Sequence, residues 1–495
     1  MMHPAIYEAL VLTLMGFSGV GAGLLLGIRQ VIPLAVAGLA ASTVIRVWSA
    51  FASWSLGLPE LNLELWVAVS AGAAVAAGIV HFREWRRALA AVVLFGGLAL
   101  AALGSKYVLD IGERHHSDVS QNIGMAVILF QGDSPDLAPA AKNFKRGIAY
   151  PLMLALGPEG RILGGFTPLI FLMTLLLAGW LARELLDASI STGLLWGVFA
   201  VVAAFSISVP MFRAAMFYLN GHTLMGFGIL LLVGGVALAF RSQQFDAVPV
   251  ALSLLGGVIG VTARIEGAVL VLTLLAMLGS APLFATCKMR LQLFSVLGLI
   301  GVSLSWWLIA LDSPVFGRLG LPLGTEWVLL VITIVGATLV ASPYMDSIRK
   351  FFVLTVIGII GIGLAREIWQ SSDPVGLILA QWPNLGLGAG GWGTAAHVFV
   401  ASAVLLGLRR RSSDYRLLLA LSAMLIGAIL YSKTFDGGFG REGFYDSVNR
   451  MWLHVMPTIL LTALIGYSEV VKNSFGSTAK PSPSRRGPDK LVSAN

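Results

Sequence analysis

The sequence has little charge and only one cysteine. Charged residues make up 12% of its 495 residues, whereas soluble domains carry about 25%. The composition is therefore not that of a soluble domain. The one cysteine, Cys287, excludes an intrachain disulfide and a metal cluster held by several cysteines. The glycine-rich stretch at 386–393 follows no strand-like segment, so we expect a loop there and not a nucleotide-phosphate cradle.

Long apolar runs dominate what is present. Hydrophobic residues account for 57% of the chain, and the mean hydropathy is +0.86. Apolar runs of around 20 residues recur along the whole sequence, which is the length that a transmembrane helix needs. The net charge of +8 does not indicate a nucleic-acid partner, because most basic residues stand at the ends of these runs, where they would contact membrane lipid.

These runs predict an all-α fold, a polytopic transmembrane helical bundle of about 13–15 spans. Residues 1–87 are interpreted as N-terminal transmembrane helices, 88–470 as a transmembrane catalytic region, and 471–495 as a disordered cytoplasmic tail. The spans are expected at residues 6–28, 31–55, 64–81, 88–105, 162–182, 189–209, 221–240, 246–263, 267–285, 292–311, 326–343, 351–367, 394–408, 417–432 and 450–468.

The basic residues between spans predict the orientation of the bundle. Basic clusters lie at 83–87, 288–290, 349–350 and 409–416, and the spans alternate without conflict if all four clusters are cytoplasmic. We therefore expect a multi-pass protein of the cytoplasmic (inner) membrane. Its extracytoplasmic side would carry the loops 105–160, 210–220, 312–325, 368–393 and 433–449. Most of the remaining polar residues are in these loops, which predicts an extracytoplasmic active site.

The longest polar stretch is the loop 105–160. A short amphipathic helix is predicted after Ser117, and the apolar piece 148–156 is too short to span, so both are expected to be interfacial helices. Further polar groups interrupt apolar segments, where charge is expensive unless it is paired or lines a cavity. They are Arg264 and Glu266 between two spans, and Arg441, Asp446, Asn449, Arg450 and His454 around the start of the final span. Asp446, Arg450 and His454 recur at helical spacing and share one face.

Three short motifs in this arrangement resemble the GT-C superfamily of membrane glycosyltransferases. They are His115-His116-Ser117-Asp118 after a span, Lys145-Arg146-Gly147-Ile148-Ala149-Tyr150-Pro151-Leu152 before the next, and Arg264-Ile265-Glu266-Gly267 in mid-chain. The resemblance covers roughly residues 88–285. It implies inverting transfer of a sugar from a polyprenyl-phosphate donor to a glycan, lipid or protein acceptor. Many members carry two adjacent acidic residues where this chain has two histidines before one Asp, and a requirement for a divalent cation stays open.

The resemblance and the chemistry of the transfer suggest roles for these residues. A carboxylate must deprotonate the acceptor hydroxyl, and cations must stabilise the departing phosphate. Asp118 is the first candidate for the base, with Asp110 and Glu113 as substitutes. The expected substrate-binding residues are His115, His116, Lys145, Arg146, Tyr150, Arg264, Glu266, Arg441, Asp446, Asn449, Arg450 and His454, and His115 and His116 could instead hold a metal with Asp118.

Each of these residues also has a purely structural interpretation. Asp118 would cap a surface helix, and Lys145 and Arg146 would anchor the chain at lipid headgroups. Arg264 would pair with Glu266, and Asp446 with Arg450. His222 is a lone histidine at the edge of a span, which favours a packing role.

Two other functions fit the same pattern. A polysaccharide polymerase or O-antigen-ligase-like enzyme would use a polyprenyl-diphosphate donor and depend on loop arginines and histidines. A transporter or flippase of lipid-linked sugars would show paired repeats with interrupted helices. The sequence shows no convincing internal repeat, and its polar residues collect on one side of the membrane.

Overall fold

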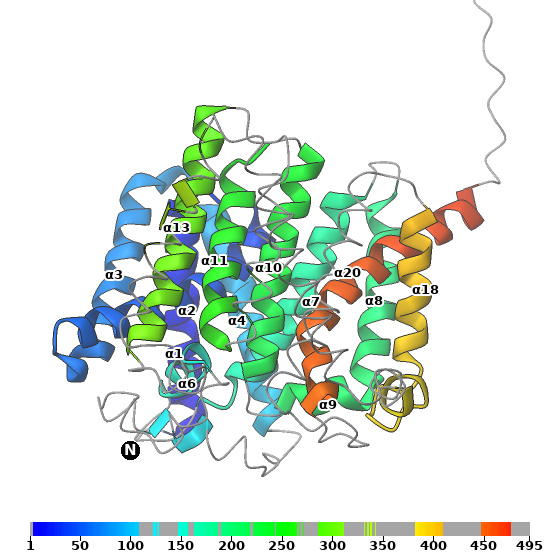
Figure 1. The fold of residues 1–495 in the computed structure, drawn as a ribbon, viewed down its shortest axis with the longest axis horizontal. Helices are drawn as coiled ribbons and strands as arrows, with labels where there is room; N and C mark the ends of the chain where they lie inside the picture. Colours follow the sequence, from blue (N-terminus) through cyan, green and yellow to red (C-terminus); the bar gives the residue numbers. More distant parts are fainter. Residues whose placement is uncertain are drawn as a thin grey trace, which may run out of the picture.

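The chain is an all-α bundle in a computed structural model (Figure 1). No strand occurs in the part of the chain that the structure describes. That part comprises residues 3–107, 122–124, 126–127, 147–156, 163–186, 190–217, 221–242, 244–264, 267, 271, 286–310, 331, 334–335, 337–338, 342, 382–408 and 447–476.

Four helices form one side of the bundle. They are α1 (Pro4–Leu25), α2 (Val31–Ser55), α3 (Asn62–Val80) and α4 (Trp85–Tyr107), with the short 3₁₀ turns η1 (Pro59–Leu61) and η2 (Phe82–Glu84) between them. The connections at Gly27 and Gly57 adopt positive φ angles of 85° and 70°, which glycine tolerates best. α1 and α2 touch through their backbones, since a Cβ on Gly19 would lie 1.7 Å from the carbonyl oxygen of Gly38.

The centre of the bundle consists of α7 (Phe166–Leu185), α10 (Gly221–Ser242), α11 (Ala247–Ala263) and α20 (Ser447–Gly476). α10 and α11 pack along their length, because glycines remove the side chains between them. A Cβ on Gly256 would lie 2.4 Å from the carbonyl oxygen of Gly228. Close packing of this kind is how membrane helices associate without a hydrophobic driving force.

Peripheral helices surround this centre. They are α8 (Thr192–Ser208), α9 (Pro210–Phe217), α13 (Cys287–Ala310) and α18 (Ala395–Leu408), together with the short π-helical turn η7 (Trp382–Gly386). α8 and α9 meet at a bend of 84°. Pro210 begins α9, and a proline at this position cannot donate the backbone hydrogen bond that would continue α8.

α2 lies inside the bundle and carries a buried polar face. Ser42, Thr43, Arg46, Ser49 and Ser53 are all buried. Arg46 donates to the carbonyl oxygen of Asn62 at 3.1 Å, and the indole of Trp48 donates to Ser303 Oγ of α13 at 2.9 Å. Through α2 the first four helices pack onto α7, α11 and α13.

Each described helix of the predicted spans overlaps its prediction, but α20 extends past the predicted 450–468 into the predicted tail 471–495. Eight described helices are long and apolar enough to cross a membrane, or nine if the bent pair α8–α9 is one span. α2 coincides with the predicted 31–55, and α11 ends at the predicted residue 263. The fold class, an all-α multi-pass membrane bundle, is confirmed. The predicted spans 267–285, 326–343, 351–367 and 417–432 lie outside the described residues, apart from isolated positions.

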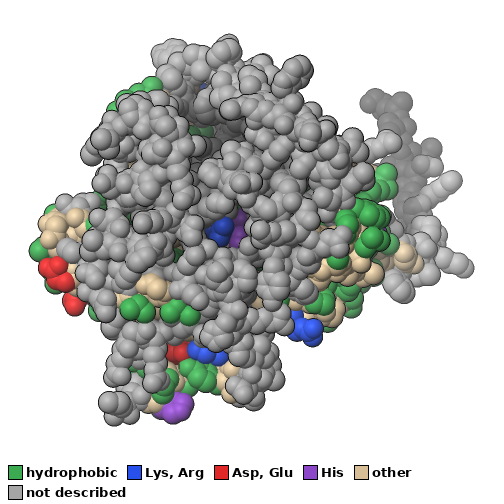
Figure 2. Space-filling model, turned by 60° about the horizontal axis from the view of Figure 1, so that its bottom comes forward, with side chains coloured by type: hydrophobic (Ala, Val, Ile, Leu, Met, Phe, Trp, Pro, Cys, Tyr) green, Lys and Arg blue, Asp and Glu red, His purple; other side chains and the backbone are tan. Residues whose placement is uncertain are grey.

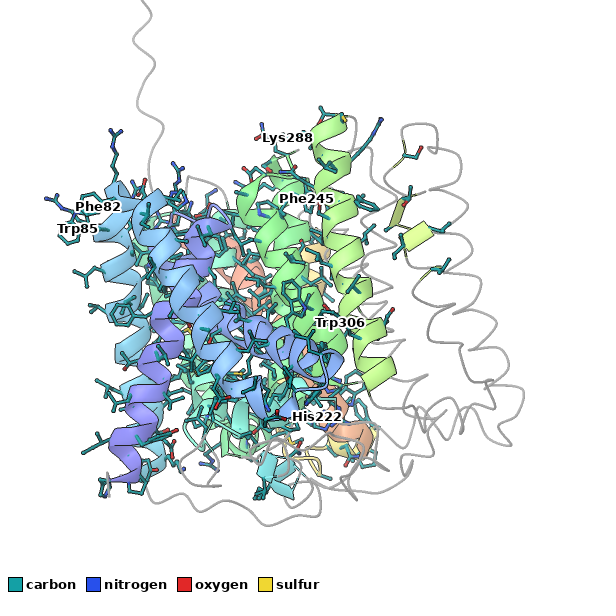
Figure 3. All side chains as sticks on the ribbon, turned by 90° about the vertical axis from the view of Figure 1, so that its left-hand side faces the viewer. Phe82, Trp85, His222, Phe245, Lys288 and Trp306 are labelled. Atoms are coloured by element: carbon teal, nitrogen blue, oxygen red, sulfur yellow. The ribbon has the colours of Figure 1, made fainter. Side chains whose placement is uncertain are left out.

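Two of the predicted cytoplasmic clusters lie at one end of the bundle. Figure 3 shows Phe82 and Trp85, which flank Arg83, at the same end as Lys288 of α13, while His222 of α10 lies toward the other end. We call the end with Phe82, Trp85 and Lys288 the basic end, and the end with His222 the opposite end. These two clusters therefore lie at one end of the bundle, as the predicted orientation requires.

Candidate functional site

The opposite end contains a buried arginine at the end of a central helix. α11 ends at Ala263, and Arg264 follows in an extended conformation with φ −159° and ψ 153°. Arg264 is only 8% exposed. A charge inside a membrane bundle is expensive unless it is paired or faces a polar cavity, so this arginine marks a candidate site.

The Gly147–Pro151 part of the predicted motif contacts the end of α11, just before Arg264. The backbone amide of Ile148 donates to the carbonyl oxygen of Thr262 at 2.8 Å. Gly147 has φ +63°, and a Cβ there would lie 2.3 Å from the backbone of Ala263. Only glycine permits both the left-handed conformation and this close approach. The motif and Arg264 are thus joined through backbone contacts, although about a hundred residues of sequence lie between them.

The segment continues as the short helix α6 (Ala149–Leu154). The prediction that it is too short to span is confirmed, but its side chains are buried by protein and do not face lipid headgroups. Tyr150 is fully buried, and its hydroxyl is hydrogen-bonded to Thr167 Oγ1 of α7 at 2.5 Å. This contact fixes α6 on α7, and a further role of Tyr150 in binding substrate stays a prediction.

Two histidines meet beside the arginine. His222 Nδ1 of α10 lies 2.5 Å from His454 Nε2 of α20, and the two rings stack with centroids 4.7 Å apart at 24°. His454 is completely buried, and its Nδ1 has no hydrogen-bond partner among the described residues. The guanidinium of Arg264 lies close enough to act on the His454 imidazole electrostatically. α10 and α20 therefore bring two imidazoles together, and the Arg264 guanidinium after α11 acts on one of them.

A helix crossing explains why the histidines meet. Pro457 of α20 has no backbone N–H, so the carbonyl of Leu453 loses its usual helical donor. α10 packs against this point through Gly226, where a Cβ would lie 2.7 Å from that carbonyl oxygen. His222 lies one turn before Gly226, and His454 follows Leu453. The glycine–proline crossing thus determines the distance between the two imidazoles.

Figure 2 looks at the molecule with the lower side of Figure 1 brought forward, and it shows a Lys or Arg side chain and a His side chain next to each other near the centre. A guanidinium beside imidazoles suits an anion, because guanidinium donors fit phosphate oxygens in a fork and a neutral imidazole can donate one N–H.

A second buried charge lies at the start of α1. The carboxylate of Glu8 accepts from Lys106 Nζ at 3.1 Å, from the Tyr107 hydroxyl at 2.6 Å and from the backbone amide of Gly165 at 2.9 Å. Glu8 is 2% exposed. This cluster joins the first residues of α1 to the last residues of α4, where the polar loop begins, and to the start of α7.

The structure describes only part of the predicted site. Arg264, His454 and Tyr150 are described with their side chains, and the first two lie close together. Asn449 and Arg450 lie in the first turn of α20, and only their backbone is described. The remaining predicted residues are outside the described part, and these are Asp110, Glu113, His115, His116, Asp118, Lys145, Arg146, Glu266, Arg441 and Asp446.

Sequence reasoning missed two residues of this end. His222 was interpreted as a packing residue, but it is paired with His454. Glu8 was not singled out, although a lone carboxylate in the first turns of an apolar helix is the kind of intramembrane charge that deserves a partner. Within the described ranges, no group of three or more His, Cys, Asp or Glu side chains could hold a metal ion.

Comparison with known proteins identifies no relative. No protein-family model, curated protein or solved structure matches the chain. The class of protein that the fold defines is therefore the multi-pass membrane helical bundle, and any function has to be argued from its own residues.

Proposed function

We propose that the chain is a membrane glycosyltransferase of the GT-C type. It transfers a sugar from a polyprenyl-phosphate donor to a glycan, lipid or protein acceptor, with its active site on the extracytoplasmic face of the cytoplasmic membrane. The observation that carries the proposal is that three separate segments bring residues predicted from the sequence to the opposite end of the bundle. The Gly147–Pro151 motif, Arg264 and His454 were each singled out by sequence. The motif contacts the backbone of Thr262 and Ala263 just before Arg264, and Arg264 acts electrostatically on His454.

The proposal assigns chemistry to these groups. Arg264 binds the phosphate of the donor and stabilises the negative charge that grows on it as the sugar departs. His454 and His222 line the same position and donate a hydrogen bond to phosphate or sugar oxygens. Asp118 of the polar loop is the proposed base that takes the proton of the acceptor hydroxyl. Lys145 and Arg146, which precede Gly147 in the sequence, are proposed to bind the same phosphate.

The test uses purified full-length protein in nanodiscs with a radiolabelled undecaprenyl-phosphate hexose, and it measures transfer to an added glycan extract. Arg264→Gln should lower kcat/KM by about 100- to 1,000-fold, as the loss of one charge-stabilising donor does in other enzymes. Arg213→Gln is the matched control, because Arg213 belongs to α9 at the same end and is exposed. Equal activity of the Arg264 and Arg213 variants would refute the proposed site.

Other outcomes would favour the alternatives. Full activity of Asp118→Asn with an undecaprenyl-diphosphate donor would indicate the polymerase or ligase chemistry. Movement of the labelled lipid across liposomes without any glycan product would indicate a transporter or flippase.

A further inference from the structure

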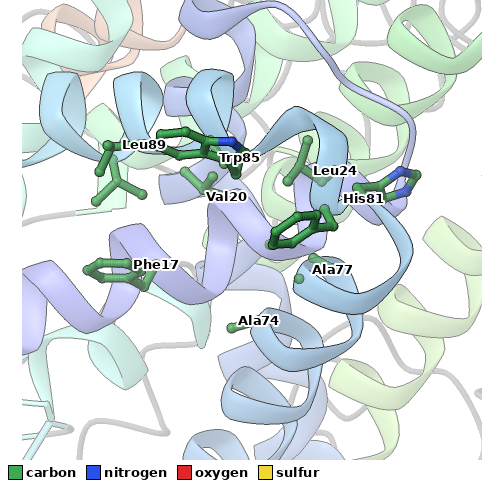
Figure 4. Close-up of a pocket in the computed structure, with 13 residues that line it drawn as sticks. Phe17, Val20, Leu24, Ala74, Ala77, His81, Trp85 and Leu89 are labelled. Carbon is green, nitrogen blue, oxygen red and sulfur yellow. The ribbon is translucent and has the colours of Figure 1, made fainter.

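An apolar groove opens between α1, α3 and α4 toward the basic end of the bundle. Its volume is about 240 Å³. Phe17 and Val20 of α1 face Trp85 and Leu89 of α4 across it, and alanines of α3 form the third wall (Figure 4). The groove lies in the outer turns of three spans, at the end of the bundle away from His222 (Figure 3).

Small residues create this groove. At Gly21 the backbones of α1 and α3 touch, because a Cβ there would lie 2.9 Å from the Cα of Ala74. About one turn further along α3, a Cβ on Gly78 would meet nothing within 4 Å. The two helices therefore close against each other at one point and leave open space at the next.

The position of the groove favours an acyl chain as its occupant. Only 17% of the α3 span and 28% of the α4 span is buried inside the protein, whereas 89% of the α10 span is. α3 and α4 thus face the surroundings of the bundle, and for a span this is hydrocarbon. Dry apolar cavities of about 150 Å³ bind benzene, so a larger apolar groove has room for a stretch of lipid tail.

Positive charge gathers beside the groove. Arg83, Arg86 and Arg87 lie within six residues after His81, which lines the groove, and all three arginines are exposed. Arg87 is paired with Glu84 at 2.7 Å, and the Arg86 guanidinium lies 5.6 Å from the ring centroid of Trp85, itself a lining residue. Three cations and one carboxylate leave this end of the groove positive, which is complementary to a phosphate headgroup.

We propose that this groove is a binding site for one anionic phospholipid. One acyl chain lies between α1, α3 and α4, and the phosphate contacts Arg83 and Arg86. The site is separate from the proposed transfer chemistry and does not depend on it. Bound there, the lipid fills the space that the divergence of α1 and α3 leaves and holds α3 and α4 against the bundle.

Native mass spectrometry of the detergent-solubilised full chain tests the proposal, with phosphatidylglycerol and phosphatidylcholine of the same acyl chains as probes. The wild-type protein should retain one phosphatidylglycerol at least tenfold more tightly than phosphatidylcholine. Gly78→Leu fills the groove and should abolish this difference. Gly72→Leu is the control, because Gly72 is also an exposed α3 glycine with open space around it, and it does not line the groove.

A second variant tests the headgroup contacts without changing the packing of the helices. The double substitution Arg83→Gln and Arg86→Gln affects exposed side chains only. It should weaken phosphatidylglycerol retention by about tenfold and leave phosphatidylcholine unchanged. Equal retention of both lipids by the wild-type protein would overturn the proposal. It would also be overturned if the folded variants Gly78→Leu and Gly72→Leu retained phosphatidylglycerol equally. Thermal unfolding of each variant verifies that it is folded.

Discussion

Glu8 offers the sharpest test of the packing at the opposite end, because its carboxylate is buried and accepts from three donors on two other segments. Glu8→Ala removes the carboxylate, which accepts hydrogen bonds from Lys106, the Tyr107 hydroxyl and the Gly165 amide. Loss of one partner of a buried ion pair costs about 3–5 kcal/mol. The Lys106 side chain is 21% exposed, so water can partly solvate its ammonium group when the carboxylate is removed. We therefore expect Glu8→Ala to lower the free energy of unfolding by about 3 kcal/mol.

Glu8→Gln separates the charge from the shape of the side chain. It keeps one carbonyl acceptor but loses the charge that strengthens each hydrogen bond, so a smaller loss of about 1.5–2 kcal/mol is expected. The measurement is reversible unfolding in mixed detergent and SDS micelles, followed by far-UV circular dichroism. A double-mutant cycle with Lys106→Met should give a coupling of about 1–3 kcal/mol.

The control for Glu8 is Glu60, an exposed carboxylate of η1. Glu60→Ala should stay within about 0.5 kcal/mol of the wild type. If Glu8→Ala lost less than about 1 kcal/mol, or if its effect simply added to that of Lys106→Met, the carboxylate would not join α1 to α4 and α7 in the way described.

Two further substitutions test the segment beside Arg264. Gly147→Ala combines a positive φ with a contact of 2.3 Å to the Ala263 backbone, so it should destabilise the protein by more than about 2 kcal/mol and displace the motif. Gly193→Ala, in open space at the start of α8, should be neutral or stabilising by up to about 1 kcal/mol in the same unfolding assay. Tyr150→Phe should cost about 1 kcal/mol by removing the hydrogen bond to Thr167, and an unchanged melting curve would contradict this.

The helices could be predicted because hydrocarbon thickness sets the length of an apolar run. α2 begins and ends at the predicted residues. α20 is longer than the predicted 450–468 and runs from Ser447 to Gly476, because a helix continues through polar residues that hydropathy does not count. The bend at Pro210 was not predicted, since the apolar run ends there without showing that a second helix follows at 84°.

The site was only partly predictable for a different reason. Arg264 and His454 were found because charged and ionisable groups are rare inside membrane spans. Their proximity could not be derived, since helical spacing gives the face of one helix and not its neighbour. His222 and His454 are 232 positions apart, and they meet because Gly226 lets α10 approach the carbonyl that Pro457 leaves free. That crossing is a property of two packed helices, and neither sequence segment shows it alone.

The polar face of α2 constrains the order in which the chain is assembled in the membrane. α2 leaves the ribosome early, but Trp48 donates to a serine 255 positions later. Until α11 and α13 are inserted, the helices present that contact α2 are α1, α3, α4, α6 and α7, and Arg46 contacts the carbonyl of Asn62. A fragment that stops before α13 would leave the Trp48 indole without its Ser303 acceptor, so the packing of α2 is complete only when α13 has reached it.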